Sequence, residues 1–229
     1  MSITENYQKI RETIPEHVTI VVAAKQRTPN EITEVIKAGA TDIGENYVQE
    51  GEKIYNTLSK EREKVRWHMI GHLQTNKINK ALKIFDVIQT IDSLEMAQAI
   101  DKRVEHTDKK VIPVYIEINI GSEISKSGIK PDYKIIEKLA KSISELEHLR
   151  LEGLMTLGPI AGNPEQSRPY FREVRGFFEK IRGLNLPRIE MKTLSMGMTN
   201  SYKVAIEEGA NMVRIGTAIF GVRGCKIFK

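Results

Sequence analysis

Lys25 directly follows an apolar run, Val18–Ala24, that is typical of a buried β-strand. A lysine at the end of such a strand is held on a rigid element, and burial favours the uncharged form of an amine. The uncharged amine is the form that condenses with a carbonyl group to give an imine. The alternative for a single lysine is a solvated residue that simply follows a strand. The other residues whose side chains could take part in chemistry decide between these two interpretations.

Polar residues and glycines also follow other apolar runs of the chain, where parallel strands would end. Because active sites of (β/α)₈ barrels lie at the carboxyl ends of the strands, these residues are candidates for one common site. They are Gly44-Glu45-Asn46-Tyr47, His68 with Gly71-His72, Gly153-Leu154-Met155-Thr156, Ser195 to Asn200, and Arg214 to Thr217.

Two of these segments suit a phosphate group. Ser195, Gly197 and Thr199 precede a helix expected to begin near Ser201, and Gly216-Thr217 follows the last strand. Glycines let backbone N–H groups approach an anion closely, hydroxyl groups add donors, and a helix N-terminus favours negative charge. Barrels often bind phosphate with the loops after strands 7 and 8. The alternative is that these residues only turn the chain and cap the helix.

Arg214 is expected near Lys25. Strand alternation places Val21, Ala23 and Lys25 on one face of the first strand, and Met212 and Arg214 on one face of the last. The first and last strands are neighbours in a closed barrel, so both cationic side chains would point to its mouth. The alternative for Arg214 is a structural ion pair at the rim.

Metal and hydrolase chemistry are not supported. His68 and His72 have the spacing of a zinc pair, but Gly71 interrupts the segment, and no HExxH motif or cysteine pair accompanies it. No GxSxG motif is present for a serine hydrolase.

Strand-like and helix-like segments alternate along the chain, and this predicts a single (β/α)₈ barrel over residues 1–229, with an extra helix near Thr4–Thr13. An open doubly wound sheet is the alternative, but no GxGxxG motif follows the first strand. The predicted strands are Val18–Ala24, Thr41–Gly44, Val65–Ile70, Phe85–Thr90, Val111–Asn119, Leu151–Leu157, Met191–Ser195 and Met212–Ile215.

Composition limits the function classes. The 229 residues carry a formal charge of +5, but lysine and arginine are mixed with glutamate, so no dedicated nucleic-acid surface is indicated. No apolar run is long enough to span a membrane, and no signal peptide is visible at the N-terminus. The single cysteine, Cys225, forms no internal disulfide, which fits a reducing compartment and predicts a cytoplasmic protein.

The chain resembles the pyridoxal phosphate homeostasis protein family, whose fold is like the N-terminal barrel of alanine racemase (fold type III of proteins that bind pyridoxal 5'-phosphate, PLP). Short segments carry the resemblance in order along nearly the whole chain. They are Ala24-Lys25 with Pro29, Gly44 to Glu50, Trp67 to Lys77, Ser125 to Gly128, Gly153 to Thr156, Leu194 to Met198, and Val213 to Gly221.

The resemblance implies that Lys25 carries the PLP imine (Schiff base). It also implies that the loops after strands 7 and 8 hold the phosphate, and that Arg214 faces the pyridine nitrogen. The chain departs from the family at Ala24, where serine is common, and after Met198, where acidic residues are common. The cofactor-binding residues that it implies are Lys25, Asn46, His68, Met155, Ser195, Met196, Gly197, Thr199, Arg214, Gly216 and Thr217.

The expected function is that of a non-catalytic PLP carrier in vitamin B6 homeostasis. An arginine at the pyridine nitrogen disfavours its protonation and weakens the ring as an electron sink. Strand 8 ends shortly before Lys229, so no second domain that could supply another base is expected. The alternatives are a PLP-dependent amino-acid racemase and a cofactor-free phosphate-binding barrel enzyme.

The sequence says less about binding partners and oligomeric state. PLP-dependent apo-enzymes are possible recipients, no membrane or nucleic-acid partner is indicated, and a monomer is favoured. Lys126 is either a hand-over residue for PLP or a solvated loop lysine, and the second interpretation is the simpler.

Overall fold

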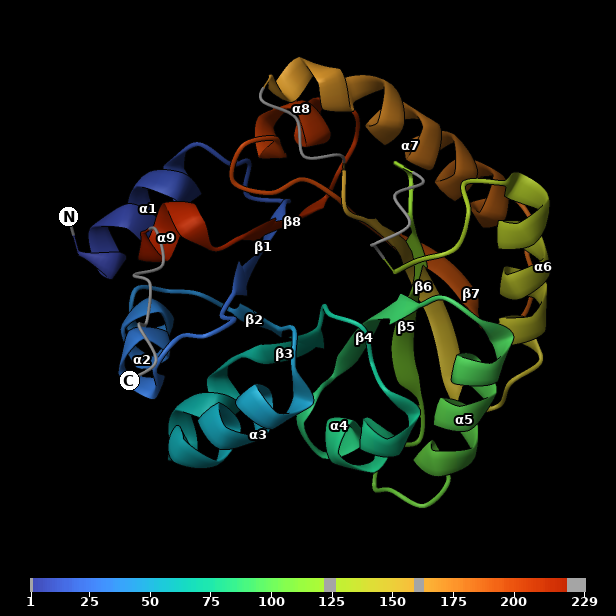
Figure 1. Ribbon diagram of the computed structural model, residues 1–229, viewed down its shortest axis with the longest axis horizontal. Helices are drawn as coiled ribbons and strands as arrows, with labels where there is room; N and C mark the ends of the chain where they lie inside the picture. The colour runs from blue at the N-terminus through green and yellow to red at the C-terminus, as the bar shows by residue number, and fades with distance from the viewer. Residues whose placement is uncertain (1, 122–126, 159–162, 222–229) are drawn as a thin grey trace, which may run out of the picture.

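The strands β1 to β8 form a closed parallel barrel in which each strand pairs with its neighbours in chain order and β1 pairs with β8 (Figure 1). The computed structural model describes residues 2–121, 127–158 and 163–221. The strands are β1 (Thr19–Ala23), β2 (Asp42–Glu45), β3 (Arg66–Met69), β4 (Val87–Ile91), β5 (Ile112–Ile118), β6 (Leu149–Thr156), β7 (Ile189–Ser195) and β8 (Met212–Ile215).

Helices surround the barrel and cover its outer face (Figure 1). They are α1 (Ile3–Glu12), α2 (Pro29–Lys37), α3 (Val48–Thr57), α4 (Ile78–Ile84), α5 (Leu94–Val104), α6 (Tyr133–Ser144), α7 (Arg168–Arg182), α8 (Tyr202–Glu207) and α9 (Thr217–Phe220). Short 3₁₀ helices lie at η1 (Ser59–Lys64), η2 (Thr75–Lys77) and η3 (Pro164–Ser167).

Local sequence explains where the helices begin. At α2, Thr28 and Glu31 form a capping box, and Pro29 occupies the first turn, where its missing N–H costs nothing. Asp132 caps α6 by accepting a hydrogen bond from the backbone N–H of Lys134. Gly183 ends α7, as its position in the sequence predicts.

Alternation along the strands divides the apolar side chains into two clusters. The outer-facing residues join the inner faces of the helices in one large core, to which α7 contributes Phe171, Val174 and Ile181. The inward-facing residues form a smaller cluster inside the barrel, which includes Val21, Met155 and Met212. A barrel interior filled by layers of side chains is a packed core rather than a pore.

The helix α1 lies beside α9, next to β8 (Figure 1). The side-chain amide of Asn6 donates a hydrogen bond to the carbonyl oxygen of Ile219 at 3.0 Å. The N-terminal helix is therefore fixed to the segment that ends the barrel.

The predicted (β/α)₈ barrel and its N-terminal helix are confirmed, with strand and helix ends within a few residues of the expected ones. Division of the chain into a single domain over residues 1–229 stays a prediction. In the described ranges, no helix is long and apolar enough to cross a membrane.

Candidate functional site

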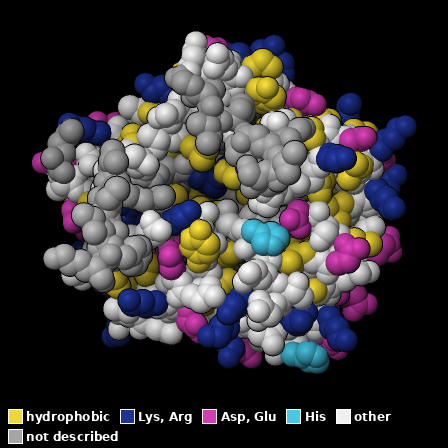
Figure 2. Space-filling model, viewed as in Figure 1, with side chains coloured by type: hydrophobic (Ala, Val, Ile, Leu, Met, Phe, Trp, Pro, Cys, Tyr) yellow, Lys and Arg dark blue, Asp and Glu magenta, His cyan; other side chains and the backbone are white. Residues whose placement is uncertain are grey.

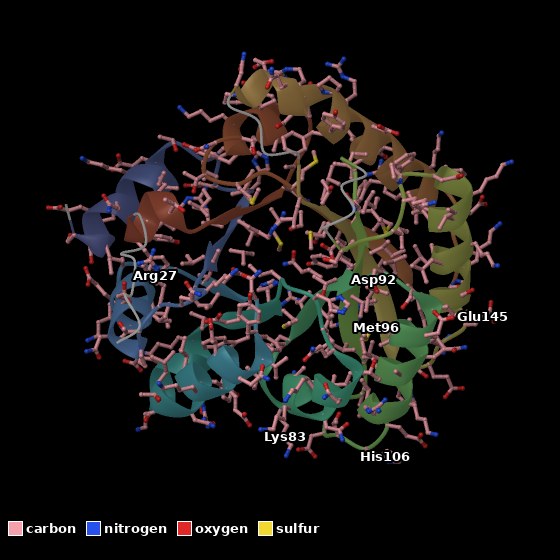
Figure 3. The ribbon with its side chains drawn as sticks, viewed as in Figure 1. Arg27, Lys83, Asp92, Met96, His106 and Glu145 are labelled. Atoms are coloured by element: carbon pink, nitrogen blue, oxygen red, sulfur yellow. The ribbon has the colours of Figure 1, made fainter. Side chains whose placement is uncertain are left out.

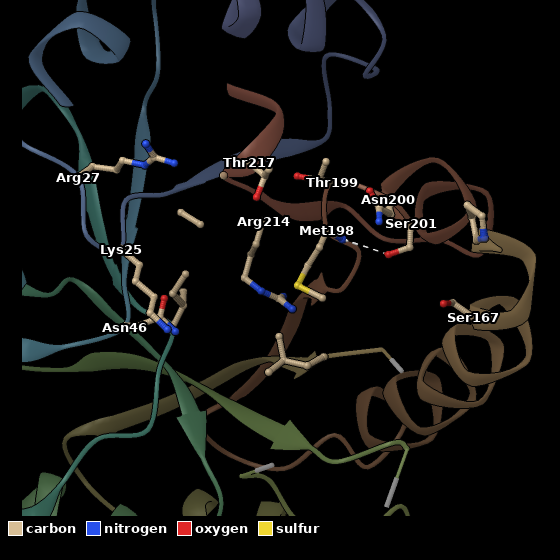
Figure 4. Close-up of a pocket in the computed structure, with 15 residues that line it drawn as sticks. Lys25, Arg27, Asn46, Ser167, Met198, Thr199, Asn200, Ser201, Arg214 and Thr217 are labelled. Carbon is tan, nitrogen blue, oxygen red and sulfur yellow. Dashed lines mark hydrogen bonds between the residues drawn. The ribbon is translucent and has the colours of Figure 1, made fainter. Parts of the chain in front are cut away.

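A cavity of about 480 Å³ opens at the carboxyl ends of β1 and β8, next to the loops after β6 and β7. Figure 2 looks onto this face and shows a central hollow that contains Lys or Arg side chains. The close-up in Figure 4 shows Lys25 and Asn46 on one side of the cavity and Thr199 and Thr217 on another. This volume lies within the range of about 300 to 1,000 Å³ that small-molecule sites occupy.

The charged side chains in the described part of the cavity lining all have the same sign. Among the described residues that line it are the cations Lys25, Arg27 and Arg214, and no aspartate or glutamate. Arg27 is partly engaged elsewhere, because it pairs with Glu31 at 3.3 Å. A concave site with excess positive charge favours an anionic ligand.

Lys25 continues the inward-facing row of β1 that begins with Val21 and Ala23. It is half-buried, and its Nζ lies 5.1 Å from the centre of the Tyr47 ring. The next residue, Gln26, adopts a left-handed backbone conformation with φ of 60°, which turns the chain out of the barrel. Its N–H donates a hydrogen bond to Glu50 at 2.9 Å, which holds this turn.

Arg214 forms part of the cavity wall and is only 4% exposed. Its Nη1 donates to the carbonyl oxygen of Ser195 at 2.9 Å and to Ser195 Oγ at 2.6 Å, and its Nη2 donates to the carbonyl oxygen of Thr156 at 2.7 Å. Burial lowers the pKa of Arg214 to about 10, and the carboxylate of Glu117 acts in the opposite direction. The guanidinium is therefore charged at neutral pH, and the groups that bind it directly are uncharged.

The loops after β7 and β8 leave hydrogen-bond donors unused. Thr199, Asn200 and Thr217 do not donate their backbone N–H groups to any other described residue. Within the first loop, the N–H of Met198 donates to Ser201 Oγ at 3.2 Å (Figure 4). The cavity therefore offers free N–H groups beside its cationic side chains.

Two glycines allow these loops to pack closely. Gly197 has φ of 92°, and a Cβ atom there would lie 2.6 Å from the Cβ of Ala205. A Cβ atom on Gly216 would lie 3.0 Å from the carbonyl oxygen of Ala23, at the junction of β8 and β1. Larger residues at either position would push the loops apart.

The structure brings six of the eleven predicted cofactor-binding residues to the cavity and leaves five beneath or beside it. Those that line it are Lys25, Asn46, Thr199, Arg214, Gly216 and Thr217. The other five, all buried and outside the lining, are His68, Met155, Ser195, Met196 and Gly197. The ligand contacts of all eleven stay predictions.

The difference has a simple geometric cause. His68 and Met155 point into the barrel as alternation predicts, but they lie one inward position too deep. Two residues further along the chain, directly after the ends of β3 and β6, Ile70 and Leu157 line the cavity instead. The sequence pattern gives the face of a strand but not the depth of each residue along the barrel axis.

Three further residues lie at or near the site and were not expected there from the sequence. Ser167 ends η3, directly before α7, and reaches the cavity through tertiary packing, for which the sequence gives no signal. Gln89 and Asp42 are polar residues at inward positions of β4 and β2, and a polar residue inside an apolar strand was the available signal. Gln89 forms hydrogen bonds with His68 and Ser195, and Asp42 forms one with His68, all beneath the cavity.

The opposite side of the barrel carries a separate polar group. Figure 3 shows Arg27 and Asp92 on opposite sides of the barrel, with Lys83 and His106 at the outer edge. Glu117 is buried, and the hydroxyl of Ser127 donates to both of its carboxylate oxygens at 3.0 and 3.1 Å. Burial raises the pKa of Glu117 to about 7.

No cluster of three or more His, Cys, Asp or Glu side chains that could hold a metal is found in the described part of the chain. His68 and His72 have separate partners, Asp42 and Asp92 respectively. Lys126 and Cys225 lie outside the described residues.

Comparison with known proteins gives one consistent result. The family model "Alanine racemase, N-terminal domain" matches residues 1–224. A pyridoxal phosphate homeostasis protein from Pasteurella multocida is 37% identical, over 97% of this chain and 98% of that protein. The solved structure of PipY from Synechococcus elongatus PCC7942 with PLP bound is 27% identical, with a TM-score of 0.86 over 96% of this chain and 100% of PipY.

An alanine racemase from Clostridium difficile 630 shares the fold at lower similarity. It is 18% identical with a TM-score of 0.77, and the match covers 100% of this chain and 59% of the racemase. At this identity the likeness concerns the barrel alone.

Proposed function

The chain belongs to the pyridoxal phosphate homeostasis proteins within the alanine racemase N-terminal domain family, and on this premise we propose that it binds PLP in the mouth of its barrel. We propose further that Lys25 holds the cofactor covalently, and that the protein acts in PLP homeostasis with little or no catalysis of its own. The single observation that carries this proposal is that Lys25 and Arg214 line the same cavity, whose described lining has no carboxylate.

The residues present fit the chemistry of PLP. Its phosphate is an anion that suits the cationic cavity and the unused N–H groups of Thr199 and Thr217. Its pyridine nitrogen is an acceptor that suits a buried guanidinium with unused donors, as in Arg214. The aldehyde that PLP supplies condenses reversibly with a primary amine and releases water, and among the described lining residues Lys25 carries such an amine.

Arg214 favours a carrier over an enzyme. A charged donor at the pyridine nitrogen disfavours proton binding by that nitrogen, and this limits electron withdrawal from a bound amino acid. Arg214 is fixed by three hydrogen bonds, so it holds this position rigidly.

The lining of the cavity supports the same conclusion. A racemase needs two groups that exchange protons near neutral pH, one on each face of the cofactor. Besides Lys25, the described lining residues include no histidine, carboxylate, tyrosine or cysteine that could serve as the second group, and arginine does not give up its proton. Glu117 has a pKa near neutrality, but it is buried beneath Ser127 and lies outside the described lining.

A spectroscopic titration tests the proposal. Addition of PLP to the purified protein should produce the absorption band of a lysine imine, with saturation at one equivalent. Lys25→Ala should abolish this band and weaken binding by about a thousandfold, because the covalent bond is lost. Lys83→Ala, on the outer edge of α4, is the matched control and should titrate like the parent (Figure 3).

Exchange at the Cα of amino acids separates a carrier from an enzyme. Incubation of the PLP-loaded protein with amino acids in deuterium oxide should give exchange much slower than about one per second, a modest enzyme rate. Exchange at that rate or faster would favour a racemase-type enzyme. The cytoplasmic location, the monomeric state and the transfer of PLP to apo-enzymes stay predictions from the sequence.

A further inference from the structure

A row of buried side chains, joined by hydrogen bonds, crosses the barrel interior from the cavity to the opposite end of the strands. Arg214 Nη1 lies 2.6 Å from Ser195 Oγ, and Ser195 Oγ lies 2.8 Å from Gln89 Oε1. Gln89 Nε2 lies 2.9 Å from His68 Nδ1, and His68 Nε2 lies 2.8 Å from Asp42 Oδ1. The five residues come from five different strands, and each is at most 9% exposed. We call this set the interior relay.

The amide of Gln89 gives the interior relay its direction. Its nitrogen has two hydrogens and two acceptors nearby, His68 Nδ1 at 2.9 Å and Met212 Sδ at 3.3 Å. Its oxygen accepts the hydroxyl proton of Ser195. The reversed amide would place its oxygen against the sulfur of Met212 and leave one amide hydrogen without this acceptor. The observed orientation therefore uses every donor of the amide.

His68 is then restricted to one protonation state. Its Nδ1 accepts from Gln89, so the ring proton is on Nε2 and is donated to Asp42. The second oxygen of Asp42 accepts from Thr41 Oγ1 at 2.7 Å, so this carboxylate acts only as an acceptor.

The surroundings of His68 keep the ring neutral. Complete burial lowers the pKa of His68, while its bond to Asp42 acts in the opposite direction. Arg66 lowers this pKa further, and Asp86 raises it.

Ser195 links Gln89 to Arg214 through its hydroxyl group. The hydroxyl proton of Ser195 is used by Gln89, so Oγ presents a lone pair to the guanidinium. Arg214 donates three of its five N–H bonds to Ser195 and Thr156, and no other described residue accepts the remaining two. Since Arg214 lines the cavity, these two donors are available to a ligand there.

We propose that His68, Gln89 and Asp42 are positioning residues for Arg214: a neutral His68 with its proton on Nε2 orients Gln89, which orients the Ser195 hydroxyl and so fixes the guanidinium at the floor of the cavity. None of the three lines the cavity, so they act through Arg214 and do not touch the ligand. The effect on PLP binding rests on the proposed function, whereas the order of the relay does not.

The first test needs no substitution. Nitrogen-15 NMR of the unliganded parent should show His68 as the neutral Nε2–H form at about pH 7, together with slowly exchanging Nη1–H groups of Arg214, which donate to Ser195. A neutral Nδ1–H form or a doubly protonated ring would overturn the proposal, because either form would remove the acceptor that Gln89 requires.

The second test breaks the relay away from the cavity. Gln89→Met keeps the size of the side chain but removes its amide, so exchange of the Arg214 Nη1–H groups should accelerate and the Kd for PLP should rise about tenfold. Asp42→Ala breaks the far end and provides a second variant if Gln89→Met does not fold. Asp42→Asn retains an acceptor for His68 and should bind PLP like the parent.

Ser144→Ala is the matched control, because Ser144 is a buried serine of α6 that donates to the carbonyl oxygen of Lys141, outside the relay. It should change neither the exchange of Arg214 nor the Kd. Parent-like exchange and Kd in folded Gln89→Met and Asp42→Ala would overturn the proposal. If the parent itself binds no PLP, the proposed function fails, and the NMR measurements still decide whether the relay fixes Arg214.

Discussion

We call Arg214 and the buried side chains beneath it the floor of the cavity, and the loops that carry Thr199 and Thr217 its rim. Polar groups of the floor are hydrogen-bonded to one another, whereas backbone donors of the rim are unpaired within the described part of the chain. On the floor, the buried side chains of Ser195, Gln89 and His68 have all their polar atoms paired with one another or with Arg214 and Asp42. At the rim, the N–H groups of Thr199 and Thr217 have no partner among the described residues. Paired buried groups give rigidity, whereas unpaired donors beside a cavity provide ligand-binding capacity. The floor therefore fixes geometry and the rim provides affinity.

Arg214 belongs to both regions, so its removal should have the largest effect. Arg214→Leu leaves the carbonyl oxygens of Ser195 and Thr156 without their donor. The free energy of unfolding should fall by about 3 kcal/mol, and PLP affinity should fall about a hundredfold. Urea denaturation and the PLP titration measure the two effects. A variant that loses affinity but keeps full stability would contradict the role of Arg214 in the floor.

Glu45, which lies outside the floor, is a buried carboxyl group that makes the stability of the protein depend on pH. It is fully buried on the outer side of β2, and neither carboxylate oxygen has a partner among the described residues. Burial, and then the charge of Glu50, raise the pKa of Glu45 to about 8. The folded state holds this proton more tightly than the unfolded state, so stability is greatest below about pH 4.5 and falls as the pH rises towards 8.

Glu45→Gln should remove this part of the pH dependence. Between about pH 6 and about pH 8, the parent should lose on the order of 2.5 kcal/mol more than the variant. Urea denaturation across this pH range provides the measurement. Parallel stability curves for parent and variant would show that Glu45 is ionised in the folded protein.

Gly197 tests whether the rim depends on close packing. Gly197→Ala introduces a Cβ atom at a position with φ of 92° and 2.6 Å from Ala205. The free energy of unfolding should fall by about 2 kcal/mol, with a parallel loss of PLP affinity as the loop moves. Gly176→Ala, on α7 with no atom within 4 Å of the added Cβ, is the control and should be at least as stable as the parent.

Thr199 should give the smallest effect. Thr199→Val removes a rim hydroxyl while keeping the shape of the side chain and its backbone N–H. PLP affinity should fall about threefold, since one uncharged hydrogen bond to the ligand is lost, and stability should change by less than about 0.5 kcal/mol, since the bond that the hydroxyl accepts from the Ala218 N–H is long, at 3.4 Å. Thr57→Val, at the exposed end of α3, should bind PLP like the parent. A larger loss of stability in Thr199→Val would place its hydroxyl with the structural floor.

The sequence predicts the rim better than the floor. Lys25, Thr199 and Arg214 could be placed at the cavity because strand ends and small-residue loops leave local signals in the sequence. The pairing of Gln89 with His68 and Ser195 could not be predicted, because it depends on the stagger of strands that are far apart in the chain. For the same reason, His68 was expected at the cavity, where Ile70 lies instead.

The most direct test of PLP binding at the barrel mouth is to map the lysine that carries the cofactor. The parent is incubated with PLP, reduced with borohydride, digested and analysed by peptide mass spectrometry. We expect one pyridoxyl adduct per chain, on Lys25, and no adduct in Lys25→Ala. Adducts spread over surface lysines, or none at all, would contradict the assignment of Lys25 and of the barrel mouth as the PLP site.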